Sequence, residues 1–221
     1  MVLMLANVLG LWGAFALWPA ASLGITAAAY FGLGSTIFRK HNGRLPWSTR
    51  VVFAPILIGH YLSLLYYRRH CRAWDEVVPG VLIGRALGNA EGGAAVEQGV
   101  TAVLDLTAEF AETAAFRNLV YRNLPILDLT APTLEQLDDA IDFIAKESAR
   151  GIVYVHCKIG YSRSAAVIGA YLLASGSAES LDDAVSQLRR ARPTIVIRPE
   201  AMEALRAYAC ELAHSTHLVR S

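Results

Sequence analysis

Hydrophobic residues are distributed unevenly along this chain, and their pattern divides it into three parts. Residues 1–38 contain no charged side chain. A single helix of that length would extend about 57 Å, nearly twice the thickness of a bilayer core, so two shorter spans fit better. The turn between them is expected at residues 18–22, because Pro19 disfavours helix for the residue before it. We therefore predict a transmembrane helical hairpin over residues 1–38.

Residues 39–72 combine a basic linker with a second apolar stretch. This stretch, residues 51–67, has arginine clusters on both sides. If it crossed the bilayer, its basic flanks would lie on opposite sides, which the positive-inside rule disfavours. A helix in the membrane interface would keep both flanks on one side. We favour the interfacial helix over a third span, and we interpret His60 as an interfacial polar residue rather than a ligand.

Residues 73–221 alternate short apolar runs with amphipathic segments. Strands are expected within residues 77–84, 100–106, 119–127 and 152–155. Helices are expected after Thr133, over residues 164–174, after Ser180 and from Pro199. This alternation predicts an α/β domain whose central, mostly parallel sheet is flanked by helices. The complete chain would be this domain preceded by an N-terminal membrane-embedded helical region.

The segment 151–164 carries the candidate chemistry. A β-branched strand, residues 152–155, leads through a loop to an apolar helix, and the loop contains Cys157 and, six positions later, Arg163. A loop entering a helix directs several backbone N–H groups at one point, and the helix dipole adds partial positive charge there. Arg163 could donate hydrogen bonds to two oxygens of a bound phosphate. The positive potential of the N–H groups and the helix dipole would also stabilise a Cys157 thiolate. A nucleophile facing a phosphate site predicts covalent phosphoryl transfer.

The run His156-Cys157-x-x-Gly160-x-x-Arg163-Ser164 resembles the signature of the cysteine-dependent protein tyrosine phosphatase superfamily, in particular its dual-specificity branch. The resemblance covers roughly residues 75–212 and leaves out the membrane part. It implies hydrolysis of phosphate monoesters through a phosphocysteine intermediate. This mechanism needs no metal or cofactor, and no metal-ligand pattern is visible in the sequence.

The resemblance also implies roles for individual residues. Cys157 would attack phosphorus, His156 would hold the loop and lower the pKa of the thiol, and Ser164 would donate a hydrogen bond to the departing thiolate. The substrate phosphate would be bound by the backbone and side chains of Lys158, Ile159, Gly160, Tyr161, Ser162 and Arg163.

The proton donor should lie on a loop at the carboxyl end of a neighbouring strand. Asp128 fits, because it follows a predicted strand, precedes a helix and lies upstream of the nucleophile. Asp105 and Glu109 also follow a strand, but nearer the core. After the first step the Asp128 carboxylate would act as the base for water.

The predicted function is a membrane-anchored phosphatase for phosphotyrosine, phosphoserine or phosphothreonine in proteins. The alternative is a lipid phosphate phosphatase of the phosphatidylglycerophosphate or phosphoinositide type. Lys158, directly after the nucleophile, matches the lysine found there in enzymes that resemble these lipid phosphatases. Tyr161 departs from them, because such enzymes often have another basic residue at this position. Two other classes are a rhodanese-like sulphurtransferase, which lacks the Arg-Ser ending, and a catalytically inactive phosphate-binding module, which usually loses the Cys, Arg or acid.

Composition and charge narrow the setting of this chemistry. Of the 221 residues, 54% are hydrophobic, and the excess lies in the N-terminal part, so the membrane is an expected partner. The formal net charge of +1 gives no general case for binding nucleic acid. The three cysteines imply no disulfide framework, and a working thiolate requires a reducing compartment. We expect an integral membrane protein with its catalytic domain on the cytosolic side.

Overall fold

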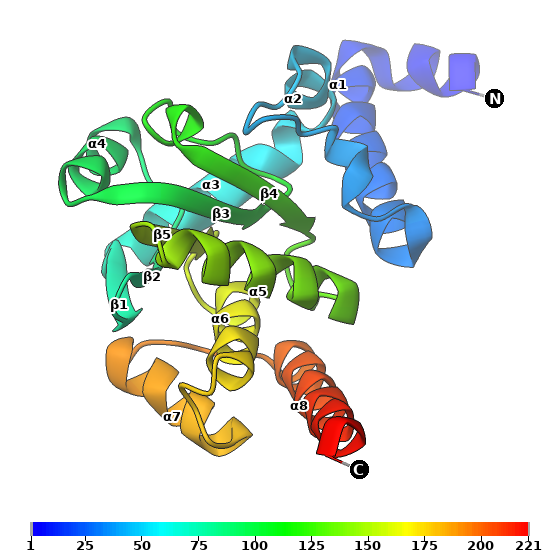
Figure 1. Ribbon diagram of the computed structural model, residues 1–221. Helices are drawn as coiled ribbons and strands as arrows, with labels where there is room; N and C mark the ends of the chain where they lie inside the picture. The colour runs from blue at the N-terminus through cyan, green and yellow to red at the C-terminus, as the bar shows by residue number, and fades with distance from the viewer. Residues whose placement is uncertain (1, 221) are drawn as a thin grey trace.

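Five strands form the sheet at the centre of the domain, and Figure 1 shows how the helices surround it. The structure is a computed structural model that describes the backbone of residues 2–220 and the side chains of residues 16–214. The strands are β1 (Trp74–Val78), β2 (Val81–Arg85), β3 (Val100–Thr107), β4 (Val120–Ile126) and β5 (Ile152–Cys157). Their order is β1-β2-β5-β3-β4, with β1 and β2 antiparallel and the other pairs parallel. The mostly parallel sheet predicted from the sequence is confirmed.

Both faces of the sheet are buried. Successive side chains of each strand point to opposite faces, so each strand contributes to two hydrophobic clusters. On one face, Val153 and Val155 of β5 pack in the main hydrophobic core, which includes Ile168 and Leu205. On the other face, Tyr154 packs in a second cluster with residues from β2 and β3. The helices of the domain are α4 (Asn89–Glu97), α5 (Leu134–Ser148), α6 (Ser162–Ala174), α7 (Leu181–Ala191) and α8 (Pro199–Arg220).

The start of α5 fixes the turn that follows β4. The Thr133 hydroxyl accepts a hydrogen bond from the Gln136 backbone N–H at 3.2 Å, and the Gln136 side chain accepts one from the Thr133 N–H at 3.1 Å. This is the capping box expected from the sequence, and it satisfies two backbone donors at the helix end. The turn between Ile126 and Leu134, which carries Asp128, therefore has both of its ends held.

The N-terminal part begins with one long helix, α1 (Val2–Ala28). It continues through Pro19, so the turn predicted at residues 18–22 is wrong: proline removes one helical hydrogen bond without ending the helix here. The backbone leaves helical geometry at Gly10 and again at Gly32, both with positive φ. Among the described residues, one stretch, Ala16–Leu33, is long and apolar enough to cross a membrane, and 11% of it is buried.

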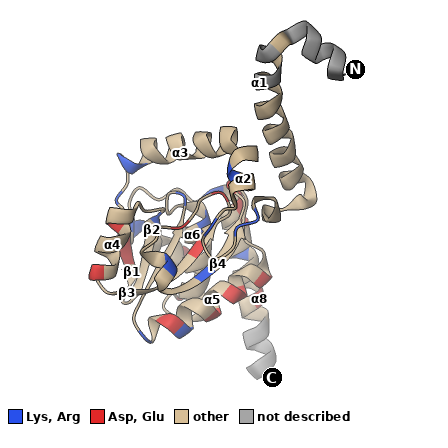
Figure 2. Ribbon diagram, turned by 90° about the horizontal axis from the view of Figure 1, so that it is seen from above, with Lys and Arg blue, Asp and Glu red and all other residues tan. Residues whose placement is uncertain are grey.

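The segment after α1 packs against the domain. It contains two short turns, η1 (Ala29–Leu33) and η2 (Ser35–Phe38), and two helices, α2 (Trp47–Val52) and α3 (Ala54–Arg68). Phe38 and Phe53 of this segment form a hydrophobic cluster with Ala108 and Leu127 of the domain. Figure 2 shows α3 lying along one side of the domain. The basic linker predicted at residues 39–50 is thus part of the folded structure.

Candidate active site

The loop between β5 and α6 forms the floor of a pocket. Cys157 ends β5, and α6 begins at Ser162, so the predicted strand–loop–helix arrangement is present. Gly160 has φ of 72°, and a Cβ atom there would lie 2.4 Å from the Gly84 carbonyl oxygen on β2. A residue with a side chain could not keep this loop so close to the sheet. The loop therefore turns back against β2 and leads into the N-terminus of α6.

Cys157 lies at the bottom of this pocket with 4% of its surface exposed. Burial alone would raise the pKa of its thiol, but the charge of Arg163, with the neighbouring polar groups of Ser164 and the Ile159 backbone N–H, lowers it below its ordinary value. The Ser164 hydroxyl is fully buried, and its oxygen has no hydrogen-bond partner among the described residues, so its predicted hydrogen bond to the departing thiolate stays a prediction. Cys157 is placed as a nucleophile should be, ionised more readily than a free thiol.

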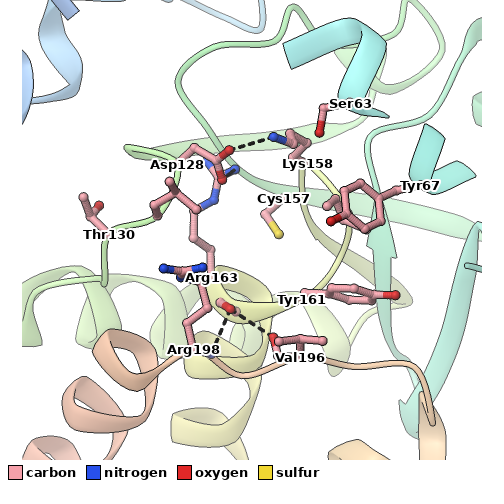
Figure 3. Close-up of a pocket in the computed structure, with 13 residues that line it drawn as sticks. Ser63, Tyr67, Asp128, Thr130, Cys157, Lys158, Tyr161, Arg163, Val196 and Arg198 are labelled. Carbon is pink, nitrogen blue, oxygen red and sulfur yellow. Dashed lines mark hydrogen bonds and ion pairs between the residues drawn. The ribbon is translucent and has the colours of Figure 1, made fainter. Parts of the chain in front are cut away.

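Arg163 points into the same pocket from the first turn of α6, as Figure 3 shows. Its guanidinium donates two hydrogen bonds to the Glu109 carboxylate, at 2.8 and 3.2 Å, and one to the Asp128 carboxylate at 3.0 Å. It also donates to the Ile126 carbonyl oxygen at 2.8 Å. Glu109, which the sequence left as a second candidate for the acid, is here the residue that orients Arg163.

Asp128 lies across the pocket from the loop, where it forms ion pairs with two cations. Its carboxylate accepts a hydrogen bond from Lys158 at 2.7 Å and the one from Arg163 already described. Burial opposes ionisation, but the charges of Arg163 and Lys158 hold the pKa of Asp128 below its ordinary value. The side chain of Lys158 is turned inward, with 10% exposed, and is not directed to solvent.

His60 of α3 also reaches Asp128. Its Nδ1 lies 3.7 Å from an Asp128 carboxylate oxygen and 3.5 Å from Lys158 Nζ. The interpretation of His60 as a residue of the membrane interface is therefore wrong. The apolar pattern around it suggested a membrane surface, but the same helix faces the pocket with His60, Ser63 and Tyr67.

The turn that carries Asp128, between Ile126 and Leu134, is here called the acid turn. The pocket between α3, the acid turn and the β5–α6 loop has a volume of about 350 Å³ (Figure 3). Most of the predicted phosphate-binding residues line it, whereas Gly160 packs against β2 behind the loop. Ser162 holds the far rim, since its hydroxyl donates to the Val196 carbonyl at 2.9 Å and accepts from the Arg198 N–H at 3.0 Å. The lining residues are Ser63, Tyr67, Asp128, Leu129, Thr130, Cys157, Lys158, Ile159, Tyr161, Ser162, Arg163, Val196 and Arg198.

His156 lies behind the loop and is 2% exposed, so it does not face the pocket. Its Nε2 lies 2.8 Å from a Glu112 carboxylate oxygen and 3.8 Å from Asp105. Burial would lower the pKa of His156, but the Glu112 and Asp105 carboxylates raise it from 6.5 to about 9. The geometry fits the predicted role of His156 in holding the loop.

This buried pair predicts a pH dependence of stability. A raised pKa means that the charged His156 stabilises the fold fully below pH 6.5, and that this contribution is lost as pH rises through about 9. In Glu112→Gln, the main partner of the charge is removed, so the loss between pH 6.5 and 9 should be smaller by up to about 3 kcal/mol. Urea unfolding of both proteins across this range measures it; parallel curves would contradict the assignment.

Two groups of side chains in this region have the composition of metal ligands. They are Asp105 with Glu112 and His156, and His60 with Glu109 and Asp128, each within 4.8 Å of one another. Cationic side chains already reach both groups. Lys40 forms an ion pair with Asp105, and Arg163 and Lys158 pair with the second group. These carboxylates therefore have protein cations as their partners.

Comparisons with known proteins agree with this geometry. The family model described as dual specificity phosphatase, catalytic domain, matches residues 89–211. Dual specificity protein phosphatase 19 of Mus musculus is 34% identical over 111 residues, which are 49% of this chain and 50% of that protein. The chain spans 36% of dual specificity protein phosphatase 12 of the mouse. The human phosphatidylglycerophosphatase and protein-tyrosine phosphatase 1 is 30% identical over 172 residues, which cover 72% of this chain and 85% of that protein.

Solved structures are similar as well. Tk-PTP in its active form is 28% identical with a TM-score of 0.57, covering 62% of this chain and 96% of that structure. PTPMT1 in complex with PI(5)P is 25% identical with a TM-score of 0.58, covering 66% of this chain and 99% of that structure. The range matched by the family model contains strands β3, β4 and β5, the β5–α6 loop and the helix α6.

Proposed function

Because the chain belongs to the dual specificity phosphatase family, we propose that it hydrolyses phosphate monoesters through a phosphocysteine intermediate. The observation that carries this proposal is the grouping of three side chains around one pocket: a thiol with a lowered pKa, Cys157, a guanidinium, Arg163, and a carboxylate, Asp128. These supply the nucleophile, the charge stabilisation and the proton that cleavage of a phosphate ester requires.

Binding of substrate explains how Asp128 can act as an acid although its pKa is lowered in the free pocket. Arg163 donates a hydrogen bond to the Asp128 carboxylate at 3.0 Å. A phosphate dianion would take this guanidinium and place two negative charges beside the carboxylate. Both changes raise the pKa of Asp128, because they remove a cation and add like charge. The substrate itself would thus favour the protonated acid.

The two chemical steps then follow from the residues in place. Cys157 Sγ forms a bond to phosphorus while the bond to the leaving oxygen breaks, and Asp128 gives its proton to that oxygen. Next, water attacks phosphorus, Asp128 takes up the proton, and the sulfur–phosphorus bond breaks. Inorganic phosphate leaves, and the thiolate is stabilised again by Arg163 and Ser164.

For the substrate, we propose phosphotyrosine, phosphoserine or phosphothreonine in proteins first and a lipid phosphate second. The lipid phosphate is kept as the second candidate because three specific observations support it. Leu129 and Val196 on the rim of the pocket are 57% and 55% exposed, so an apolar group next to the phosphate would find apolar contacts. Lys158 inside the pocket adds a cation for an acidic headgroup. A solved relative is described in complex with PI(5)P, a lipid phosphate.

We also propose that the N-terminal part holds the catalytic domain at the cytosolic side of a membrane. The stretch Ala16–Leu33 exposes large apolar side chains such as Phe31, which is 91% exposed. Basic residues follow at Arg39 and at Arg68, where α3 ends. Because α3 packs over the pocket, an interfacial position suits it better than a third span.

One panel tests these proposals. The full chain in detergent or in phospholipid vesicles is offered an aryl phosphate, phosphotyrosine and phosphoserine peptides, phosphatidylglycerophosphate and phosphoinositides. We expect release of inorganic phosphate that vanadate inhibits, and sedimentation of the protein with the vesicles. Thiocyanate formation from thiosulphate and cyanide without phosphate release would instead indicate a sulphurtransferase. Phosphate binding without turnover would indicate an inactive module, and recovery in the supernatant would contradict membrane attachment.

A further inference from the structure

We propose that the segment from Ala29 to His60 is a working part of the active site, in which Tyr30 and His60 position Asp128. This segment, here called the brace, comprises residues 29–60 and precedes the residues that the family model matches. The proposal rests on the proposed function, because it assigns the brace to the proton donor of that reaction.

Two side chains of the brace hold Asp128, Tyr30 directly and His60 through Lys158. The Tyr30 hydroxyl donates a hydrogen bond to the Asp128 backbone carbonyl oxygen at 2.8 Å. His60 Nδ1 lies 3.7 Å from the Asp128 carboxylate and 3.5 Å from Lys158 Nζ, the cation that binds the same carboxylate. Burial lowers the pKa of His60, which favours the neutral ring, whose Nδ1 can accept a hydrogen bond from Lys158. The backbone of Asp128 and its carboxylate are thus each reached from a different helical element.

The rest of the acid turn is held by the same brace. The Ser35 hydroxyl donates to the Pro125 carbonyl oxygen at 2.8 Å, and Leu127 is buried in the cluster that contains Phe38 and Phe53. Leu129, directly after the acid, has φ of 63°, a conformation that a leucine adopts at a cost. A turn with such a residue keeps its shape only when its surroundings hold it, and here the brace forms much of these surroundings.

The brace itself is fixed to the ends of the strands. Lys40 forms a buried ion pair with Asp105 at the end of β3 and donates to the Thr107 carbonyl oxygen at 2.9 Å. The Gly43 carbonyl oxygen accepts a hydrogen bond from the Glu112 backbone N–H at 2.7 Å. Since Asp105 and Glu112 are also the carboxylates around His156, the brace is anchored to the layer that supports the phosphate loop. It can therefore transmit a fixed position to Asp128.

The consequence concerns proton donation rather than phosphate binding. If the contacts with the brace are weakened, Asp128 is displaced while Cys157 and the loop keep their places. An ester with a poor leaving group needs the proton and should be slowed, whereas one with a good leaving group should be little affected. A general loss of structure would slow both kinds of ester equally.

The test uses Tyr30→Phe and His60→Gln in the full chain. Both are assayed with p-nitrophenyl phosphate, which has a good leaving group, and with an alkyl phosphate, which has a poor one. Each variant should lose about tenfold in kcat on the alkyl phosphate, the equivalent of one hydrogen bond, and less than about twofold on the aryl phosphate. Tyr66→Phe on α3 and His70→Gln just after its end, both exposed and neither lining the pocket, are the matched controls and should keep the wild-type ratio.

The outcomes separate this inference from the proposed function. Equal losses on both esters, or an unchanged ratio in both variants, would overturn the role of the brace while phosphatase activity stands. A wild-type protein that hydrolyses neither ester would overturn the proposed function and this inference with it. The two variants lie in different elements, so failure of one to fold, seen as a lowered Tm, leaves the other to decide.

Discussion

Cys157→Ser is expected to lower kcat by a factor on the order of 10⁶, the effect of removing a covalent nucleophile that acts together with its neighbours. The pocket is built around a sulfur anion. Arg163 supplies the cation, and the polar groups of Ser164 and the Ile159 backbone N–H lie close enough to favour the thiolate. A serine hydroxyl in the same place stays protonated at neutral pH. It carries no negative charge for these groups to stabilise, so it is a much weaker nucleophile than the thiolate. The rate of aryl phosphate hydrolysis measures the loss.

A second cysteine provides the control for this variant. Cys210 lies on α8, is exposed and does not line the pocket, so Cys210→Ser should keep wild-type kcat. Cys157→Ser should still bind a phosphorylated substrate, because Arg163 and the loop N–H groups remain. Rapid acid quenching of the wild type during turnover should trap phosphate on the protein, and the variant should trap none. Turnover that survives in Cys157→Ser would exclude Cys157 as the nucleophile.

The part of the site that sequence could predict is the part that is local in the chain. Cys157 and Arg163 are six residues apart, and a strand–loop–helix arrangement brings them to one point whatever the rest of the fold does. Asp128 could be predicted as the proton donor with one further inference, because the carboxyl ends of parallel strands meet at one edge of a sheet. The order β5-β3-β4 places the ends of these strands next to one another.

The contacts that the sequence did not predict join distant residues. Tyr30 and Asp128 are 98 positions apart, and Lys158 and His60 are also 98 apart. Nothing in the local pattern distinguishes a helix that is apolar because it faces lipid from one that packs on a domain. Lys40 is a further example, because the sequence placed it in a basic linker, and its partner Asp105 lies 65 positions away. Its side chain is buried against Asp105, and only the fold identifies the carboxylate that compensates its charge.

Asp128→Asn is expected to lower kcat by about 10²–10⁴-fold on esters with poor leaving groups, the usual contribution of a general acid. On p-nitrophenyl phosphate the loss should be small, because that leaving group departs without a proton. The wild-type rate should fall at high pH, as the substrate-bound acid loses its proton, and this fall should be absent in the variant. Asp138→Asn, an exposed residue of α5, is the matched control.

The resting contacts of Asp128 sharpen this prediction, because they separate acid catalysis from substrate binding. Arg163 and Lys158 both donate to the carboxylate in the free pocket, at 3.0 and 2.7 Å, and a phosphate dianion must compete with it. An asparagine holds these cations less strongly, so KM in Asp128→Asn should be unchanged or lower while kcat falls. A residue that only bound substrate would raise KM instead. If Asp128→Asn raises KM and lowers kcat equally on both kinds of ester, Asp128 is not the general acid. The proposal that the brace positions a proton donor would then fail as well.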